Sequence, residues 1–249
     1  MQFIKRAPQG ASALKAEAQG LETLSRLFDE QDIALYTPKI IALNDRQLVL
    51  EYINTKPASQ QQFETLGRNL AKAHLCYGAS YGFHADNFIG LNPQPNIQSQ
   101  NWGEFFLNYR LIYQINLIQD TKLKSSFNQV LNNNSERLIA FLNGTCQGPS
   151  LLHGDLWNGN VLFSHDDKVW LIDPAVYYGD REAEIAMTEV FGGFSPVFYS
   201  AYTELAPLHK EYETKRDIFN LYHYLNHFNL FGNGYLSACQ KGLKVIESL

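Results

Sequence analysis

The segment HGDLWNGN occupies residues 153–160 and decides the fold of this chain. Short apolar runs that alternate like strands flank it within residues 150–172, in a region that is otherwise helical in pattern. Asp155 and Asn160 lie five residues apart in the segment, and Asp173 ends the run VWLID thirteen residues after Asn160. A hairpin of that length returns Asp173 to the side of Asn160. Polar side chains at the ends of short strands are typical of a functional site.

The spacing of these residues matches the pattern H-x-D-L-x-x-x-N of a kinase catalytic loop. In that role Asp155 orients an acceptor hydroxyl and takes its proton. Asn160 and Asp173 supply hard oxygen atoms to Mg²⁺, which binds through few protein ligands when phosphates provide the rest. The alternative is that Asp155 and Asp173 only cap turns. The ordered set, with both spacings and the flanking strands in place, favours the catalytic interpretation.

Two charged residues near the N-terminus match a second feature of kinases. Lys5 ends the strand-like run FIK, and Glu17 lies on an amphipathic helix predicted over residues 12–30. This order is that of the strand lysine and helix glutamate that hold ATP phosphates. The alternative is an unrelated exposed lysine and an ordinary helical glutamate. Residues 48–53 (LVLEYI) are then the hinge strand, whose backbone pairs with adenine through Glu51, Tyr52 and Ile53.

The distribution of patterns along the chain predicts two parts. Residues 1–55 form a strand, a helix and a hairpin, whereas residues 56–249 are mainly helical. Ser12 is a candidate N-cap of the first helix. Residues 79–101, which are rich in Gly, Asn, Pro and Gln, indicate a long ordered loop. Ser195, followed by Pro, indicates the start of another helix.

Composition excludes several classes of protein. The chain has 249 residues, 45% hydrophobic and 18% charged, which is enough for one large domain or two lobes. Its net charge of −5 gives no reason to expect a nucleic-acid partner. The three cysteines form no CxxC pair, which favours reduced thiols. No apolar run approaches the length of a signal peptide or a membrane span, so we expect a cytoplasmic protein with no membrane partner.

Several segments together resemble the fructosamine kinases, also called ketosamine-3-kinases, within the aminoglycoside-phosphotransferase group. The bare HGDL pattern is shared across that group. The tryptophan within HGDLWNGN, the stretch DPAVYYGDRE and the segment NWGEFF resemble the ketosamine kinases more closely. The matching segments run from the first strand to the last helices: FIK, AEAQGL, LVLEYI, LGRNLAKAH, GFHADNFIG, PQPN, NWGEFF, HGDLWNGN, IDPAVYYGDREAEIAM and LYHYLNHFNLFG.

This resemblance implies an α+β, protein-kinase-like two-lobe fold with a truncated N-terminal sheet lobe and a mainly helical C-terminal lobe. It implies phosphorylation of a sugar hydroxyl, with ATP and Mg²⁺ as cofactors. The substrates are small ketosamines or glycated lysine side chains on proteins, and the phosphorylated adduct falls apart. Asp155 is then the base, Asn160 and Asp173 are the magnesium ligands, and Lys5 with Glu17 holds the phosphates.

The resemblance also suggests substrate contacts. Trp102 and Trp157 are candidate walls of the sugar pocket, with simple core packing as the alternative. Asp180 and Arg181 are candidate contacts to the substrate. Equally, Asp180 can cap the following helix, with Arg181 in a structural ion pair.

The resemblance is incomplete at the N-terminus. The family has two strands joined by a Gly-rich turn ahead of the strand that contains Lys5, and we expect this chain to lack them. Because that turn covers the β- and γ-phosphates, its loss lowers the rate, and the uncovered sheet edge favours self-association. Three hypotheses follow: an active ketosamine kinase, a truncated and inactive kinase fold, and a kinase of another small molecule such as an aminoglycoside.

Overall fold

The N-terminal segment forms a three-stranded antiparallel sheet in the order β1-β3-β2, in a computed structural model that describes residues 1–6 and 10–249. Its central strand is β3, whose apolar residues are buried, while β1 lies at an edge with Phe3 and Ile4 half exposed. In the register of β1 and β3, Lys5 lies opposite Leu48. The strands are β1 (Gln2–Lys5), β2 (Ile40–Leu43) and β3 (Leu48–Glu51).

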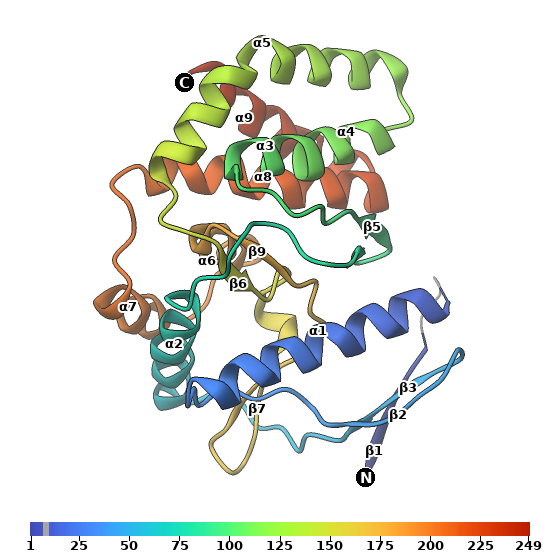
Figure 1. The fold of residues 1–249 in the computed structure, drawn as a ribbon, viewed down its shortest axis with the longest axis vertical. Coiled ribbons are helices and arrows are strands. Elements are labelled where there is room, and N and C mark those ends of the chain that lie inside the picture. Colours follow the sequence, from blue (N-terminus) through green and yellow to red (C-terminus); the bar gives the residue numbers. More distant parts are fainter. Residues whose placement is uncertain (7–9) are drawn as a thin grey trace. The chain divides into compact units, whose positions relative to one another are not determined.

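Helix α1 (Ala11–Glu30) lies along this sheet (Figure 1) and forms a small core with it. Leu14 and Leu21 of α1 pack with Leu48 and Leu50 of β3. Burying each leucine contributes about 1.5–3 kcal/mol, and the helical spacing in the sequence correctly predicts the buried face. The prediction of Ser12 as N-cap is wrong. The helix begins after Gly10, at a φ of 84°, without any side-chain cap.

Helices α2 (Gln60–His74) and α7 (Pro196–Leu205) pack closely against each other. Ser59 and Gln62 form a reciprocal capping box at the start of α2. The predicted start of α7 is confirmed, since the Ser195 side chain accepts a hydrogen bond from the Val197 amide. Gly67 allows the close approach: a Cβ atom there would lie 2.3 Å from the carbonyl oxygen of Phe198.

The segment around HGDLWNGN consists of short strands and one short helical turn. In the antiparallel pair β7–β8, Val161 lies opposite Leu171 and Phe163 opposite Val169, so the predicted hairpin is confirmed. It joins the N-terminal part through a backbone bridge between Thr55 and Ser164. The elements are β6 (Ser150–Leu152), η2 (Asn158–Asn160), β7 (Val161–Phe163) and β8 (Val169–Leu171).

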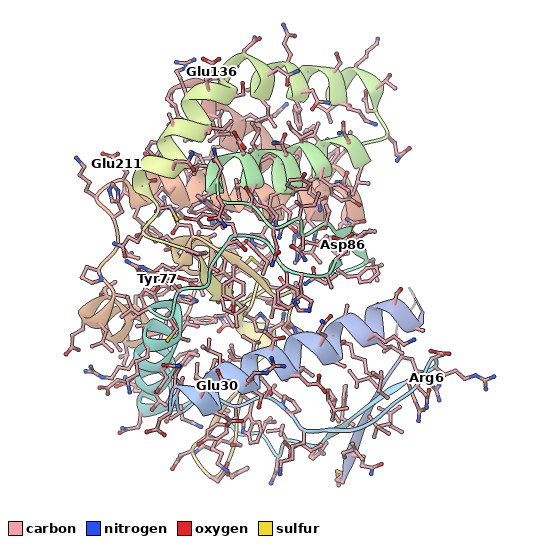
Figure 2. The ribbon with its side chains drawn as sticks, in the orientation of Figure 1. Arg6, Glu30, Tyr77, Asp86, Glu136 and Glu211 are labelled. Atoms are coloured by element: carbon pink, nitrogen blue, oxygen red, sulfur yellow. The ribbon has the colours of Figure 1, made fainter. Side chains whose placement is uncertain are left out.

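The contacts divide the chain into two compact units. Unit 1 contains residues 1–77, 150–177 and 188–208, and unit 2 contains residues 78–149, 178–187 and 209–249. Unit 1 groups residues 1–55 with the β7–β8 hairpin, whose Ser164 and Trp170 form backbone bridges with Thr55 and Tyr36. The predicted lobe boundary after residue 55 stays a prediction. Figure 2 marks Tyr77, which ends the first segment of unit 1, and Glu211, which immediately precedes helix α8 of unit 2.

Unit 2 is mainly helical. Helix α8 packs on α9, and α5 packs on α3 and α9. Asp120 caps α5, accepting hydrogen bonds from the amides of Lys122 and Leu123. The helices are α3 (Trp102–Phe106), η1 (Leu107–Ile112, a π-helix), α4 (Tyr113–Leu117), α5 (Thr121–Thr145), α8 (Tyr212–Phe231), η3 (Asn233–Tyr235) and α9 (Leu236–Glu247). Strand β9 (Tyr177–Gly179) and helix α6 (Arg181–Thr188) also belong to unit 2, except for their end residues Tyr177 and Thr188.

The predicted loop over residues 79–101 contains a small hairpin. Strands β4 (Asn87–Ile89) and β5 (Asn92–Gln94) pair antiparallel, and the Gln94 side chain donates a hydrogen bond to Asn87 at 2.7 Å. The strands are three residues long, too short for an alternating pattern to reveal them. Among the described residues, no helix combines the length and apolar character that crossing a membrane requires.

Candidate active site

Asp173 and Asn160 are brought together by the hairpin that the sequence predicts. Asn160 immediately precedes β7, and one residue, Ile172, separates Asp173 from the end of β8. The amide of Ile172 donates a hydrogen bond to the carbonyl oxygen of Asn160 at 3.1 Å, which fixes the two strand ends side by side. Asp173 adopts a φ of 56°, in the left-handed region that non-glycine residues avoid. Such strain is held by surrounding structure and is common at functional sites.

Asp155 is held in place by Asn160 and by His153. The Asn160 side-chain amide donates to the Asp155 carbonyl oxygen at 2.8 Å and to its carboxylate oxygen Oδ2 at 3.2 Å. The backbone amide of Asp155 donates to Nδ1 of His153 at 3.3 Å. Because Nδ1 accepts, the proton of the ring lies on Nε2, which is 2.8 Å from the carbonyl oxygen of Ile172. His153 therefore links the loop that contains Asp155 to the strand end that contains Asp173.

Gly154 is required at its position for two reasons. Its φ of 84° lies in the left-handed region, and a Cβ atom would lie 2.1 Å from the carbonyl oxygen of Ala175. The amide of Ala175 donates to the carbonyl oxygen of His153 at 2.8 Å, so the two chain segments are in direct backbone contact there. Only glycine allows the tight turn between His153 and Asp155.

Lys5 forms two ion pairs, one of which the sequence did not indicate. Its Nζ atom lies 2.7 Å from Oε2 of Glu17, as predicted, and 2.8 Å from Oδ1 of Asp173. Burial alone would lower the pKa of Lys5, but the carboxylates of Glu17 and Asp173 outweigh burial and the pKa is raised. Burial raises the pKa of Glu17, and the ammonium group of Lys5 offsets only part of that effect. Lys5 is therefore a firmly protonated cation beside the predicted metal ligand.

A cavity of about 260 Å³ in unit 1 contains the predicted hinge and Asp173. Its apolar wall is formed by Phe3 of β1, Leu50 of β3, Leu162 of β7, and Ile172 just after β8. The hinge residues that line it are Glu51, Tyr52 and Ile53. An apolar cavity with a few convergent polar groups is the usual form of a small-molecule site. Sequence reasoning did not identify the apolar wall residues, because their role depends on the packing of three separate segments.

Two hinge amides already have partners. The amide of Glu51 donates to the carbonyl oxygen of Lys39 at 3.0 Å, and the amide of Tyr52 donates to that of Met1 at 3.4 Å. Ile53, which also lines the cavity, forms no hydrogen bond with any residue that the structure describes.

Trp157 is exposed close to Asp155, while Trp102 is buried. The Trp157 side chain is 37% exposed and packs edge-on against Phe191, with ring centroids 5.6 Å apart. Trp102 is 1% exposed within an aromatic cluster of unit 2 that includes Phe106 and Phe219. Burial favours core packing over a role for Trp102 as a wall of a sugar pocket. Phe191 was missed, although the pair Gly192-Gly193 beside it was a signal of an unusual turn.

Asp180 and Arg181 are buried inside unit 2. The Asp180 carboxylate accepts from the Glu182 amide at 3.0 Å, which is the helix-capping arrangement considered from the sequence. Lys215 lies 2.7 Å from Asp180 and 2.6 Å from Glu182. Burial raises the pKa of Asp180, and Lys215 opposes that rise. This buried charge cluster favours a structural role over substrate contact for Asp180 and Arg181.

The donor chemistry of Asn160 and Asp173 fits a divalent cation bound together with phosphates. Within residues 1–6 and 10–249, no three His, Cys, Asp or Glu side chains converge as a metal site by themselves. The Asn160 amide nitrogen is engaged with Asp155, so the side-chain oxygen is the group left to coordinate a cation. One carboxylate and one amide oxygen suit Mg²⁺, which retains water and phosphate ligands.

The small antiparallel sheet, the mostly helical remainder of the chain and the arrangement of Asp155, Asn160 and Asp173 define an α+β kinase-like fold. The structure of the aminoglycoside phosphotransferase APH(2")-IIa with streptomycin and ATP is similar at a TM-score of 0.57. The match covers 100% of this chain and 85% of that chain. At 17% identity this likeness concerns the fold alone.

More specific similarity comes from the sequence. The family model described as fructosamine kinase matches residues 2–248. A probable ketoamine kinase of Synechocystis is 37% identical over 92% of this chain and 77% of its own length. The chloroplastic protein-ribulosamine 3-kinase of Arabidopsis thaliana is 36% identical over 92% of this chain and 70% of its own length. This chain belongs to the fructosamine kinase family.

A crystal structure agrees with this assignment. The putative fructosamine-3-kinase of Haemophilus somnus has a TM-score of 0.84 at 27% identity, over 98% of this chain and 82% of that chain.

Proposed function

We propose that this protein is an ATP-dependent ketoamine kinase, which phosphorylates a sugar hydroxyl of a ketose attached to an amine. The observation that carries the proposal is the position of Lys5. Its ammonium group lies between Glu17 and Asp173, and Asp173 also lines the apolar cavity beside the hinge. Phosphoryl transfer from ATP requires a fixed cation for the phosphates, a carboxylate that can bind a metal ion, and a pocket for the adenine ring.

The nucleotide would bind with its base in the cavity of unit 1. Phe3, Leu162 and Ile172 provide apolar surface for a purine, and the N–H of Ile53 would provide a donor to its edge. Lys5 would neutralise phosphate oxygens while Glu17 holds it in place. Asn160 and Asp173 would hold Mg²⁺, which neutralises charge on the phosphates when it is bound.

Asp155 would act as the base. Asn160 holds its Oδ2 atom, and the Gly154 turn and His153 hold its backbone. The acceptor hydroxyl gives its proton to Asp155 as its oxygen forms a bond to the γ-phosphorus. The bond from that phosphorus to the β–γ bridging oxygen breaks, and ADP leaves.

The acceptor class is proposed from the family. The relatives named above are described as ketoamine and ribulosamine kinases, and a small ketoamine or a glycated lysine on a protein is the corresponding substrate here. The phosphorylated adduct would then break down and free the amine, which is deglycation. Self-association through the β1 edge stays a prediction.

The test is ADP release from Mg-ATP with ribulose-lysine, fructose-lysine and an aminoglycoside as acceptors. We expect turnover with at least one ketoamine and none with the aminoglycoside. Turnover with the aminoglycoside alone would overturn the proposed function. So would a failure to turn over any of the three acceptors.

A further inference from the structure

A short loop in unit 1 is closed at both ends by one hydroxyl group. The Tyr199 hydroxyl lies 3.1 Å from the hydroxyl of Thr188, and it accepts a hydrogen bond from the amide of Phe194 at 3.0 Å. The Phe194 ring packs against Phe198 with centroids 4.9 Å apart. Residues 189–193, which we call the Gly-Gly loop, are therefore held between two fixed points.

The backbone of the Gly-Gly loop has a conformation that glycine favours. Gly192 and Gly193 adopt φ angles of 92° and 75°. A Cβ atom at Gly192 would meet nothing within 4 Å, so the requirement there is conformational and not steric. Phe191 therefore lies within a loop whose ends are tied together.

The Gly-Gly loop is attached to the catalytic loop by two contacts. The Asn158 side chain donates a hydrogen bond to the carbonyl oxygen of Gly193 at 2.7 Å. The rings of Phe191 and Trp157 meet edge-on, at an interplanar angle of 70°. On its own loop, Trp157 lies across Gly159, where a Cβ atom would approach the indole ring to 2.4 Å. The indole is thus held between a glycine and Phe191.

The backbone of Trp157 lies close to that of the proposed base. Trp157 follows Asp155 by two residues, so their Cα atoms are within about 7 Å of each other. Aromatic faces attract cations and pack well against the C–H surface of a sugar or an alkyl chain. A ketoamine presents both features, because its secondary amine is protonated near neutral pH and is attached to a carbon chain.

We propose that Phe191 is an acceptor-specificity residue, which completes with Trp157 an aromatic wall for the alkylammonium part of the ketoamine. This inference rests on the proposed function. The Tyr199 hydroxyl and Asn158 hold the loop that carries Phe191. The wall is distinct from the nucleotide cavity, whose lining residues include neither Trp157 nor Phe191. Phe191 therefore affects acceptor binding and leaves ATP binding unchanged.

The test compares kcat, KM for the ketoamine and KM for ATP among parent, Phe191→Ala, Phe191→Leu and Phe191→Tyr. We expect Phe191→Ala to raise the ketoamine KM about 5- to 20-fold, with the ATP KM changed less than about twofold. Phe191→Tyr should keep the ketoamine KM close to that of the parent, because tyrosine retains the aromatic ring. Phe191→Leu fills similar volume without a π-face and stays impaired.

Phe231→Ala is the matched control, since it removes the same ring from a side chain of α8 that is 68% exposed. It should leave all three constants unchanged. An unchanged ketoamine KM in both Phe191→Ala and Phe191→Leu overturns the role of Phe191 but not the proposed function. Equal changes in the two KM values, or full recovery in Phe191→Leu, also overturn it. A parent enzyme that turns over no ketoamine overturns the proposed function itself.

Discussion

Replacing Lys215 by methionine should destabilise the protein without altering its active site. The Lys215 side chain is 1% exposed, and its ammonium group contacts Asp180 at 2.7 Å, Glu182 at 2.6 Å and the carbonyl oxygen of Thr145 at 3.1 Å. Methionine keeps most of the apolar stem but removes the charge. The two buried carboxylates then lose the cation that both contact, and Glu182 keeps its 3.9 Å contact with Arg181.

The size of the loss follows from this burial. Removing one partner of a buried ion pair costs about 3–5 kcal/mol, because the remaining charge is uncompensated. A protein of this size loses roughly 2–4 °C in Tm for each kcal/mol, so the expected decrease is roughly 6–20 °C. Lys241→Met is the matched control. Lys241 is 71% exposed and pairs with Asp217 at 3.3 Å, and an exposed pair contributes at most about 1 kcal/mol.

Urea denaturation at pH 7 and pH 5 is the assay. Without Lys215, the pKa of a buried carboxylate in the folded state rises further above its unfolded value. A carboxylate whose pKa is higher in the folded state than in the unfolded state destabilises the folded protein at pH values above its unfolded-state pKa. This destabilisation decreases as the pH falls and the carboxylate becomes protonated in the folded state. The deficit of Lys215→Met should therefore be smaller at pH 5 than at pH 7. A loss below about 1 kcal/mol at pH 7, or a deficit that grows at pH 5, would show that Lys215 does not stabilise these carboxylates as an ion pair.

Two further predictions concern single residues. Burial lowers the pKa of His223 to about 3, so the folded state resists protonation and stability decreases as pH falls below 6.5. Urea unfolding should show a loss of about 2 kcal/mol from this group between pH 6.5 and 5, which His223→Gln removes; an equal loss in the variant would contradict the assignment. Gly154→Ala should abolish turnover because its Cβ atom meets the carbonyl oxygen of Ala175, whereas Gly144→Ala, on a helix with open space, should raise stability by about 0.5–1 kcal/mol. Near-native turnover in Gly154→Ala would contradict the requirement for glycine.

The sequence was sufficient where the geometry depends on local spacing. The hairpin between Asn160 and Asp173 has a length that its strand pattern sets, and the structure has the same pairing. The pair of Lys5 and Glu17 follows from the register of one strand and one helix, and its ion pair is present. Ser195 begins a helix as its side-chain chemistry predicts.

The sequence was insufficient where packing between distant segments decides the outcome. The contact of Lys5 with Asp173 joins residues 168 positions apart, and no local pattern indicates it. The sequence pattern around Trp102 is the same for a core residue and for a residue that lines a sugar pocket. Only the burial of its side chain in the structure distinguishes the two roles. The same holds for Asp180, whose partner Lys215 lies on a separate helix.

The role of Asp155 as the base is tested most directly by comparing the parent with Asp155→Asn in ADP release from Mg-ATP and ribulose-lysine. Asparagine keeps the shape of the side chain but cannot take the proton of the acceptor hydroxyl. We expect kcat to fall by about 10²–10⁴, while the ATP KM and the urea midpoint stay close to those of the parent. An Asp155→Asn variant that turns over as fast as the parent would contradict the assignment of Asp155 as the base.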